Sequence, residues 1–386
     1  MKNCLTSRTA AFVVTLGLCY LHSTSIAIGQ DVPVVVGRIV GHDFNPLNAD
    51  GSFTSDRSLQ KNGIADLANL DWQTRLLAIR DLLRSLPDER DAVVLSLENK
   101  NPHVRQIAAA VLGIAKQTDA IRPLLAVLQS DGSALVRSQA AFSLGQLEAN
   151  EAIESLRFHF ENDPSKDVRH QCELAIDQIE KRKGATIDQL QAFRQLDEST
   201  FERAKLGNHA PDFTLSDTDG NNWKLSDANR GKWVVLIWIF ADWCPVCHSE
   251  FNDLMSMRKE FEDAKVSVVT MECHDSFRSR VMVGKEKDAD YWFSKSSFQE
   301  KYRKSIWWPH LSDLAGAVGA QYGVDPMSFA VHAEYVNRPS TIIIDPQGVI
   351  RFAYYGTFWG DRPSMHETLG MIKAESFIYE NPKRLK

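Results

Sequence analysis

The distribution of apolar residues divides the chain into two parts with different periods. From about residue 66 to 183, apolar positions recur at helical spacing and the whole pattern repeats. Gly113 and Gly145 stand in register in successive units. A Val-Arg pair recurs every 32 residues, at Val104-Arg105, Val136-Arg137 and Val168-Arg169. Each unit therefore predicts two short amphipathic helices whose apolar stripe is buried only against neighbouring units.

The Val-Arg pair and the alanine-rich second helix of each unit resemble HEAT-type repeats. We expect a solenoid of about four units over residues 66–183, with a weaker first unit near Trp72. Repeats of this kind commonly form surfaces for protein partners, so the resemblance implies a docking module. Cys172 falls where Ala108 and Ala140 fall in earlier units, and we expect it to be a buried structural thiol.

Beyond a helical linker at 184–205, strand-like runs alternate with helical patterns. Residues 233–240 form a continuous apolar run without alternation, as in a strand that is buried on both faces of a sheet. A helical pattern follows from Phe251 to Phe261. We therefore predict two domains: the all-α solenoid, and an α/β domain over residues 206–386.

A pair of cysteines lies where the apolar strand is predicted to turn into the helix. Cys244 would occupy the first turn, where free backbone amides and the helix dipole favour a thiolate, so we expect it to be the attacking sulfur. Cys247 follows three residues later, shielded by the helix, and is placed to attack a mixed disulfide and release the partner. The spacing predicts thiol-disulfide exchange with a separate role for each sulfur.

The sequence Trp-Cys-Pro-Val-Cys at 243–247, after a buried strand, resembles the thioredoxin superfamily. The motif Ala-Pro-Asp-Phe-x-Leu at 210–215 resembles its redoxin branch, which includes peroxiredoxin-like proteins and exported thiol reductants of cytochrome c maturation. The resemblance extends over roughly 206–386. It implies a thioredoxin-like fold with a central mixed sheet, protein thiols or disulfides as substrates, and no cofactor.

The resemblance also implies three supporting residues. Trp243 precedes the dithiol, and Pro339 matches a family proline that has a cis peptide bond and packs beside the dithiol. Glu250 matches a family glutamate that assists proton transfer near the second cysteine. The residues alone also allow a second interpretation of Glu250, as a solvent-exposed carboxylate that only stabilises the N-terminus of its helix.

Two other functions stay open. A peroxiredoxin needs a threonine or serine three residues before its peroxide-attacking cysteine, and an arginine that holds the peroxide. With Cys247 as that cysteine, Cys244 takes the hydroxyl position and Pro339 the arginine position, while Arg338 is one step out of register. We therefore favour disulfide exchange over peroxidase activity. The second alternative is a HEAT-repeat binding protein whose redoxin domain is not catalytic.

A third cysteine and two histidines allow further interpretations of the site. Cys273, next to His274 after a predicted strand, fits a structural thiol, a third, resolving thiol, or part of a metal site with the dithiol. We expect no metal. Cys244, Cys247 and His248 also match the C-x-x-C-H pattern of covalent haem attachment. The buried strand and the counterpart of the family proline favour the redoxin interpretation, because haem attachment needs neither.

Composition and net charge limit the kinds of partner that we expect and say less about the fold. The chain has 386 residues, of which 44% are hydrophobic and 24% charged, and its net charge is −6. These values are those of an ordinary globular protein. Because the chain has neither a basic surplus nor a block of like charges, we expect no nucleic acid partner.

The N-terminus has the pattern of a secretory signal peptide over residues 1–29. Lys2 and Arg8 precede an apolar run of about 12 residues, well short of the roughly 20 that a membrane span needs, and small residues follow. We expect a mature protein without an integral membrane span, located outside the cytoplasm in the periplasm or the medium. Residues 30–65 mix a strand-like run with turns and predict an irregular lead-in.

Overall fold

The computed structural model describes an all-helical part of the chain followed by an α/β part. The described residues are 63–69, 71–181, 187–242, 244–274, 276–285, 306–326, 329–331, 334–356 and 360–379. The predicted signal peptide and nearly all of the predicted lead-in lie outside these ranges. Among the helices within them, none is both long enough and apolar enough to cross a membrane.

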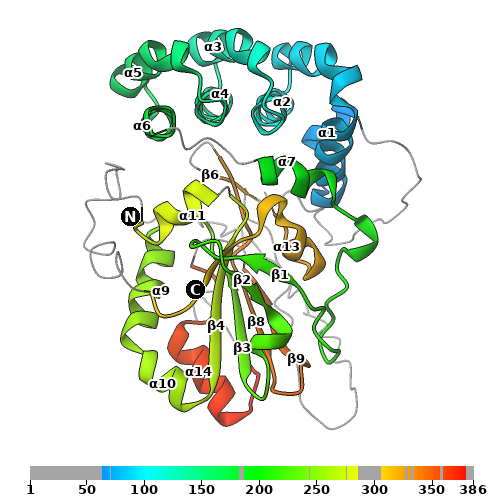
Figure 1. The fold of residues 1–386 in the computed structure, drawn as a ribbon, viewed down its shortest axis with the longest axis vertical. Helices are drawn as coiled ribbons and strands as arrows, with labels where there is room; N and C mark the ends of the chain where they lie inside the picture. The colour runs from blue at the N-terminus through cyan, green and yellow to red at the C-terminus, as the bar shows by residue number, and fades with distance from the viewer. Residues whose placement is uncertain are drawn as a thin grey trace, which may run out of the picture.

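The helices of the first part stack in two layers, as a HEAT-like solenoid predicts (Figure 1). α2, α4 and α6 lie toward the second domain, and α3 and α5 lie on the outside. Cys172 of α6 is completely buried in the shared core, as expected, and burial raises its pKa. The α-helices are α1 Trp72–Leu95, α2 Pro102–Ile114, α3 Ile121–Ser130, α4 Ala134–Gln146, α5 Ile153–Asn162 and α6 Lys166–Glu180. Short 3-10 helices lie at Ile64–Ala68, Ser96–Glu98, Thr118–Ala120 and Asn150–Ala152.

The repeated Val-Arg pair has two structural roles. Its valines are buried in the core. The first two arginines each bind an aspartate near the start of the next inner helix: Arg105 Nε lies 2.6 Å from Asp131, and Arg137 Nε lies 2.9 Å from Asp163, whereas Arg169 donates to Asp163 O at 2.6 Å. Burial raises the pKa of Asp163, but the hydrogen bonds from Arg137 and from a backbone amide outweigh it and hold that pKa below its usual value. The 32-residue spacing thus reflects a ladder of ion pairs between units.

The two glycines in register mark places where the next inner helix passes closely. A Cβ atom at Gly113 would lie 2.8 Å from the Cβ of Ser143. One at Gly145 would lie 2.9 Å from the Cα of Ala175. Close-packed interiors do not accommodate such overlaps without a shift of the backbone, so both positions require glycine.

The segment between the two domains is bound to both of them. α7, Ile187–Arg194, lies against α1, and the Nε of its last residue donates to Leu83 O at 3.0 Å. Further along, the amide of Glu202 donates to Ala320 O of the second domain at 2.8 Å. Ala315 and Ala320 belong to the same buried cluster as the solenoid residues. The two domains therefore share part of one hydrophobic core. A 3-10 helix at Glu198–Thr200 lies in this segment.

The second domain is built on a five-stranded mixed sheet of order β5-β4-β3-β8-β9. β3 is parallel to β4 and antiparallel to β8, while β4 is parallel to β5 and β8 is antiparallel to β9. Successive residues of β3 alternate between two buried clusters, which confirms the predicted strand buried on both faces. The strands are β3 Trp233–Trp238, β4 Val266–Glu272, β5 His310–Ser312, β8 Ser340–Ile344 and β9 Ile350–Tyr355. Two hairpins pair β1 Thr214–Ser216 with β2 Asn222–Lys224, and β6 Phe329–Val331 with β7 Glu334–Val336.

Helices cover both faces of this sheet. One cluster is contributed by α9 Pro245–Ser256, α10 Arg258–Asp263, α11 Ser276–Met282 and α14 Met365–Ala374. The other cluster includes α8 Leu225–Ala228 and α13 Ala317–Gln321. A 3-10 turn at Leu314–Gly316 comes directly before α13. The solenoid lies across the end of the sheet at which β3 and β4 end, and α11 lies between the sheet and the solenoid (Figure 1). The predicted dithiol, which follows β3, is therefore at the domain interface.

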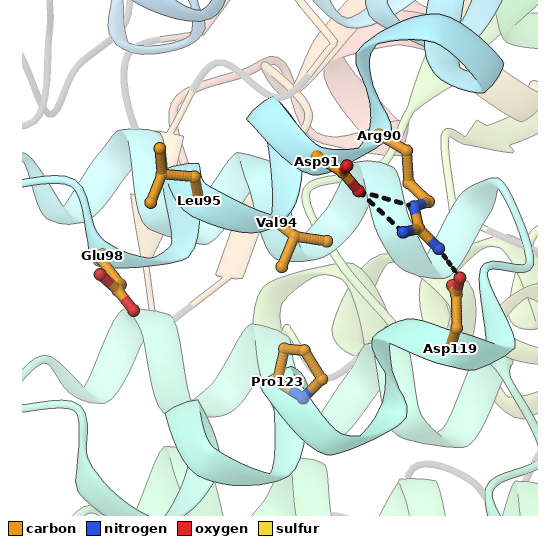
Figure 2. Close-up of a pocket in the computed structure, with 7 residues that line it drawn as sticks. All are labelled: Arg90, Asp91, Val94, Leu95, Glu98, Asp119 and Pro123. Atoms are coloured by element: carbon orange, nitrogen blue, oxygen red, sulfur yellow. Dashed lines mark hydrogen bonds and ion pairs between the residues drawn. The ribbon is translucent and has the colours of Figure 1, made fainter.

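A surface hollow of about 450 Å³ lies on the solenoid, between the end of α1 and the start of α3 (Figure 2). Arg90 and Asp119 form an ion pair beside it. Leu95, which is 67% exposed, and Pro123 form apolar parts of its wall. No residue of the predicted dithiol site lines this hollow, so it is separate from the candidate active site.

Candidate active site

The dithiol lies at the junction of β3 and α9, as the sequence predicts. Cys244 is the N-cap of α9, and the amide of Cys247 donates to its Sγ at 3.4 Å. Pro245 is the first residue of the helix, where its missing amide hydrogen costs nothing. Trp243, predicted to support the site, lies outside the described residues. A thiol at an N-cap can thus take the place of the usual hydroxyl or carboxylate cap.

Both sulfurs are buried: the exposed fraction of Cys244 is 0%, and so is that of Cys247. They belong to one hydrophobic cluster with β3, α9 and α11. Thiol exchange requires one sulfur to meet a partner sulfur directly. In this arrangement neither can, so the structure represents a state in which the dithiol is closed to macromolecules.

Cys247 has the more polar surroundings of the two. Its Sγ accepts the amide of Phe240 at 3.3 Å and lies 3.4 Å from Arg362 Nη2. Burial raises the pKa of Cys247, but the hydrogen bond from Cys244 and the charge of Arg362 outweigh burial and bring that pKa below its usual value. An N–H donor and a guanidinium both favour the thiolate form.

Cys244 behaves in the opposite way. Burial is the largest effect and raises the pKa of Cys244 well above its usual value, and the hydrogen bond to Cys247 adds to it. The prediction of a lowered pKa at Cys244 is therefore wrong for this structure. The physical reason is that desolvation outweighs the helix N-terminus, while the nearest cation, Arg362, lies beside Cys247.

Glu250 is buried, with an exposed fraction of 8%, and forms an ion pair with Arg362. Arg362 Nε lies 2.6 Å from Glu250 Oε1, and Arg362 Nη1 donates to Trp238 O at 2.8 Å. The alternative of a solvent-exposed carboxylate is wrong. The pair connects α9, the end of β3 and the segment before α14, and it holds the guanidinium against the sulfur of Cys247.

Arg362 is a site residue that the sequence did not reveal. It lies 112 positions from Glu250 and two before Ser364, the N-cap of α14. The capping box of Ser364 and Glu367 marks the start of that helix in the sequence, but nothing in its pattern indicates a contact with the dithiol. Only the packing of α14 beside α9 brings the arginine there.

The loop before the dithiol is held by a second buried ion pair. Arg278 of α11 donates through Nε to Asp242 Oδ2 at 2.7 Å, and both side chains are at most 1% exposed. His248 Nε2 lies 2.6 Å from Asp242 O, and burial lowers the pKa of His248 to about 4, so the imidazole is neutral at pH 7. His248 thus turns this nitrogen to the backbone of the loop in this structure and does not present it to a haem iron.

Pro339 lies beside the site but without the expected bond geometry. β3 and β8 pair with Trp238 opposite Ser340, which places Pro339 next to the end of β3. The residues that the structure describes contain no cis peptide bond, so the prediction of one at Pro339 is wrong. Backbone hydrogen bonds fix the chain on either side of the proline: the Arg338 amide donates to Asp325 O at 3.2 Å, and Pro339 O accepts from Gly356 at 2.8 Å.

Cys273 follows β4 and is half-buried. Its neighbours form a polar cluster in which His274 and His310 each lie 3.5 Å from Glu272. Burial raises the pKa of Glu272, but the two histidines outweigh it and hold that pKa far below its usual value. Within the described ranges, no group of three or more His, Cys, Asp or Glu side chains is placed to hold a metal ion, so the alternative of a metal site has no support there. The resolving role of Cys273 stays a prediction.

Comparisons with known proteins agree with this arrangement. Residues 206–353 match the AhpC/TSA family, and residues 64–145 and 90–177 match HEAT repeats. Alkyl hydroperoxide reductase E of Mycobacterium bovis is 31% identical over 148 residues, which are 38% of this chain and 83% of that protein. Thioredoxin-like protein YneN of Bacillus subtilis is 30% identical over 151 residues, 39% of this chain and 72% of that protein.

Two further similarities concern one more relative and one solved structure. Thiol-disulfide oxidoreductase ResA of Bacillus subtilis is 29% identical over 172 residues, 45% of this chain and 78% of that protein. The crystal structure of peroxidoxin BcpB from Mycobacterium tuberculosis aligns with 44% of this chain and 97% of its own, at 23% identity and a TM-score of 0.35. Residues 206–353 match the AhpC/TSA family, and two relatives are at 30% identity or above. This chain therefore belongs to the AhpC/TSA family, and HEAT repeats precede its thioredoxin-like oxidoreductase domain.

Proposed function

We propose that the chain is a thiol-disulfide oxidoreductase that acts on protein partners through Cys244 and Cys247. The observation that carries the proposal is the position of both sulfurs at the start of α9. The Cys247 amide donates to Cys244 Sγ at 3.4 Å, and Arg362 lies beside the sulfur of Cys247. In the proposed reaction Cys244 is the sulfur that attacks once it becomes accessible, and Cys247, whose pKa is lowered, is the thiolate that releases the partner.

The reaction proceeds in two exchanges. Once accessible, the Cys244 thiolate attacks a partner disulfide, a bond between Cys244 and one partner sulfur forms, and the other partner sulfur leaves as a thiolate and takes up a proton. Cys247 then attacks the sulfur of Cys244 and releases the second partner thiol. Two electrons pass to the partner, and the dithiol becomes a disulfide. The lowered pKa of Cys247 favours this second step, because the thiolate is the nucleophile.

Reduction of insulin disulfides by the reduced protein tests the proposal. We expect Cys244→Ser to abolish turnover, and Cys247→Ser to retain the partner as a mixed disulfide on Cys244. A pull-down with Cys247→Ser, eluted by a reductant, would then identify the physiological partner. Full activity of Cys244→Ser would contradict the proposal, and an unreactive dithiol would favour a binding protein with a non-catalytic redoxin domain.

One observation favours peroxidase activity as a second candidate. The sulfur of Cys247 has a cation and an amide donor within 3.4 Å, which is how a peroxide-attacking thiolate is stabilised. In that reaction Cys247 takes an oxygen from the peroxide to form a sulfenic acid, water or an alcohol leaves, and Cys244 condenses with the sulfenic acid to a disulfide and water. Peroxide consumption by Cys244→Ser, with Cys247 intact, separates the two functions: one turnover supports the peroxidase, and none supports exchange.

We also propose that the protein works outside the cytoplasm and that its solenoid docks a protein partner. The signal-like pattern over residues 1–29 supports the first proposal, and the matched HEAT repeats support the second. Fractionation of cells that produce the full chain tests the location: recovery of the complete, uncleaved chain in the cytoplasm would contradict it.

A further inference from the structure

Thiol exchange at Cys244 requires a change of structure, because the exposed fraction of this residue is 0%. We infer that the solenoid is the gate: it closes over the dithiol through Phe142 and α6, and Cys244 reacts with a partner only when this end of the solenoid moves away. The inference rests on the proposed exchange function and adds a regulation of the same site.

The first contact of the gate is a stacked arrangement around Arg278. The guanidinium lies over the ring of Phe142 in α4, at 5.8 Å from the ring centroid, within the range of a cation–π interaction. The same guanidinium forms the buried ion pair with Asp242, two residues before Cys244. One side chain of α11 thus connects the inner layer of the solenoid to the loop that carries the attacking thiol.

The second contact is apolar. Leu174 of α6 is 0% exposed, and it belongs to the hydrophobic cluster of Cys244 and Cys247 and not to the solenoid cluster around it. A solenoid residue therefore lies in the same buried cluster as the dithiol. Removal of that leucine by movement of α6 would open one side of the cluster to water.

The two ends of the solenoid differ in how they are held. Near α1, Arg194 Nε of α7 donates to Leu83 O, and residues of α7 share a buried cluster with Ala315 and Ala320 of the second domain, although the chain itself leaves the solenoid at the end of α6. Near α4 and α6, Phe142 and Leu174 contact the second domain through their side chains, and α4 also lies against β7. The second end is the one that can separate while the first acts as the pivot. A protein partner that docks on the solenoid could then uncover the thiol that acts on it.

The test is the rate at which Cys244 of the reduced full-length protein reacts with a thiol-alkylating reagent, located by peptide mass spectrometry and measured across pH. The pH profile separates the fraction of thiolate from the accessibility of the sulfur. We expect the limiting rate at high pH to be at least tenfold higher in Phe142→Ala than in the wild type, which corresponds to about 1.4 kcal/mol of opening free energy. Phe158→Ala is the matched control, because Phe158 lies on α5 and is 61% exposed, and we expect no change.

Cys172 distinguishes opening from unfolding, because it is fully buried inside the solenoid. Faster labelling of Cys244 with Cys172 still protected supports the gate. If Phe142→Ala unfolds the solenoid and labels both, Phe142→Leu decides: it keeps an apolar side chain and removes only the ring face, so labelling of Cys244 alone should rise.

Two results would overturn the inference. One is a wild-type Cys244 that is alkylated as fast as an unhindered thiol. The other is a protected Cys244 whose rate does not change in either Phe142 variant. Failure of the proposed function has a different signature: Cys244 becomes accessible in Phe142→Ala, yet insulin reduction does not appear.

Discussion

Replacement of Arg362 by methionine should raise the pKa of Cys247, because it removes the cation that lies 3.4 Å from the sulfur. The change is best made in a Cys244→Ser background, where a hydroxyl replaces the neighbouring thiol and only one dithiol sulfur titrates. Methionine fills a similar volume without charge, so the packing around Trp238 O and the end of β3 is disturbed least.

The magnitude follows from the geometry. Two unit charges about 4 Å apart interact by about 4 kcal/mol at an effective dielectric constant of about 20. At about 1.4 kcal/mol per pKa unit, the full interaction is worth about three units. Glu250 carries the opposite charge in the same ion pair and raises the pKa of Cys247, so Arg362 and Glu250 partly cancel at the sulfur. Because Arg362→Met removes only the arginine's contribution and leaves that of Glu250, we expect the pKa of Cys247 to rise by up to about three units, and by less where water enters the space of the guanidinium.

Glu250→Gln is the companion variant, and its expected effect has the opposite sign. It removes the negative charge and leaves the guanidinium, so the pKa of Cys247 should fall. Both variants break a buried ion pair, which costs about 3–5 kcal/mol of stability. The double variant Arg362→Met with Glu250→Gln removes both charges and should recover part of that loss.

Thiolate absorbance in the ultraviolet as a function of pH gives the pKa of Cys247 directly, and the rate of alkylation under mild denaturant gives an independent value. Urea unfolding at pH 7 measures the stabilities. If Arg362→Met leaves the midpoint unchanged while the protein stays folded, then the guanidinium does not stabilise the thiolate and the electrostatic argument for the site is wrong.

Two further predictions concern parts of the molecule away from the dithiol. The depressed pKa of Glu272 means that its carboxylate stabilises the fold above its unfolded pKa, about 4.3, and that this stability is lost as the pH falls further. The difference in urea unfolding between the wild type and Glu272→Gln should therefore be large at pH 7 and shrink toward pH 3; a difference independent of pH would contradict this. Gly145→Ala should destabilise the solenoid by about 1–3 kcal/mol, because the new Cβ meets the Cα of Ala175 at 2.9 Å. Gly132→Ala is the control, since a Cβ there has no neighbour within 4 Å, and equal thermal unfolding midpoints for the two variants would refute the packing argument.

Local periodicity was sufficient to predict the repeats, the buried strand and the helix that carries the dithiol. The spacing of the Val-Arg pairs corresponds to the spacing of the ion pairs between units, and each ion pair joins residues only 26 positions apart. The apolar run of β3 predicts burial on both faces because every second side chain enters a different cluster.

Local periodicity could not predict the charge distribution at the site. The sequence places Cys244 at a helix N-terminus and predicts the lower pKa there, but the deciding cation comes from 115 positions downstream of Cys247. Burial of Cys244 depends on the packing of its hydrophobic cluster, to which β3, α11 and Leu174 of the solenoid contribute. The repeat pattern does not single out Phe142, and only the assembled domains show its contact with Arg278.

The shared core at the pivot has a consequence for how the molecule comes apart. Ala315 and Ala320 complete the packing of solenoid residues, although they are separated from the repeats by the whole first half of the sheet. A cut at the sequence boundary near residue 206 would leave each half with an uncovered apolar surface. The two parts of the sequence are therefore expected to unfold as one cooperative unit, so that heating melts the repeats and the redoxin domain in a single transition.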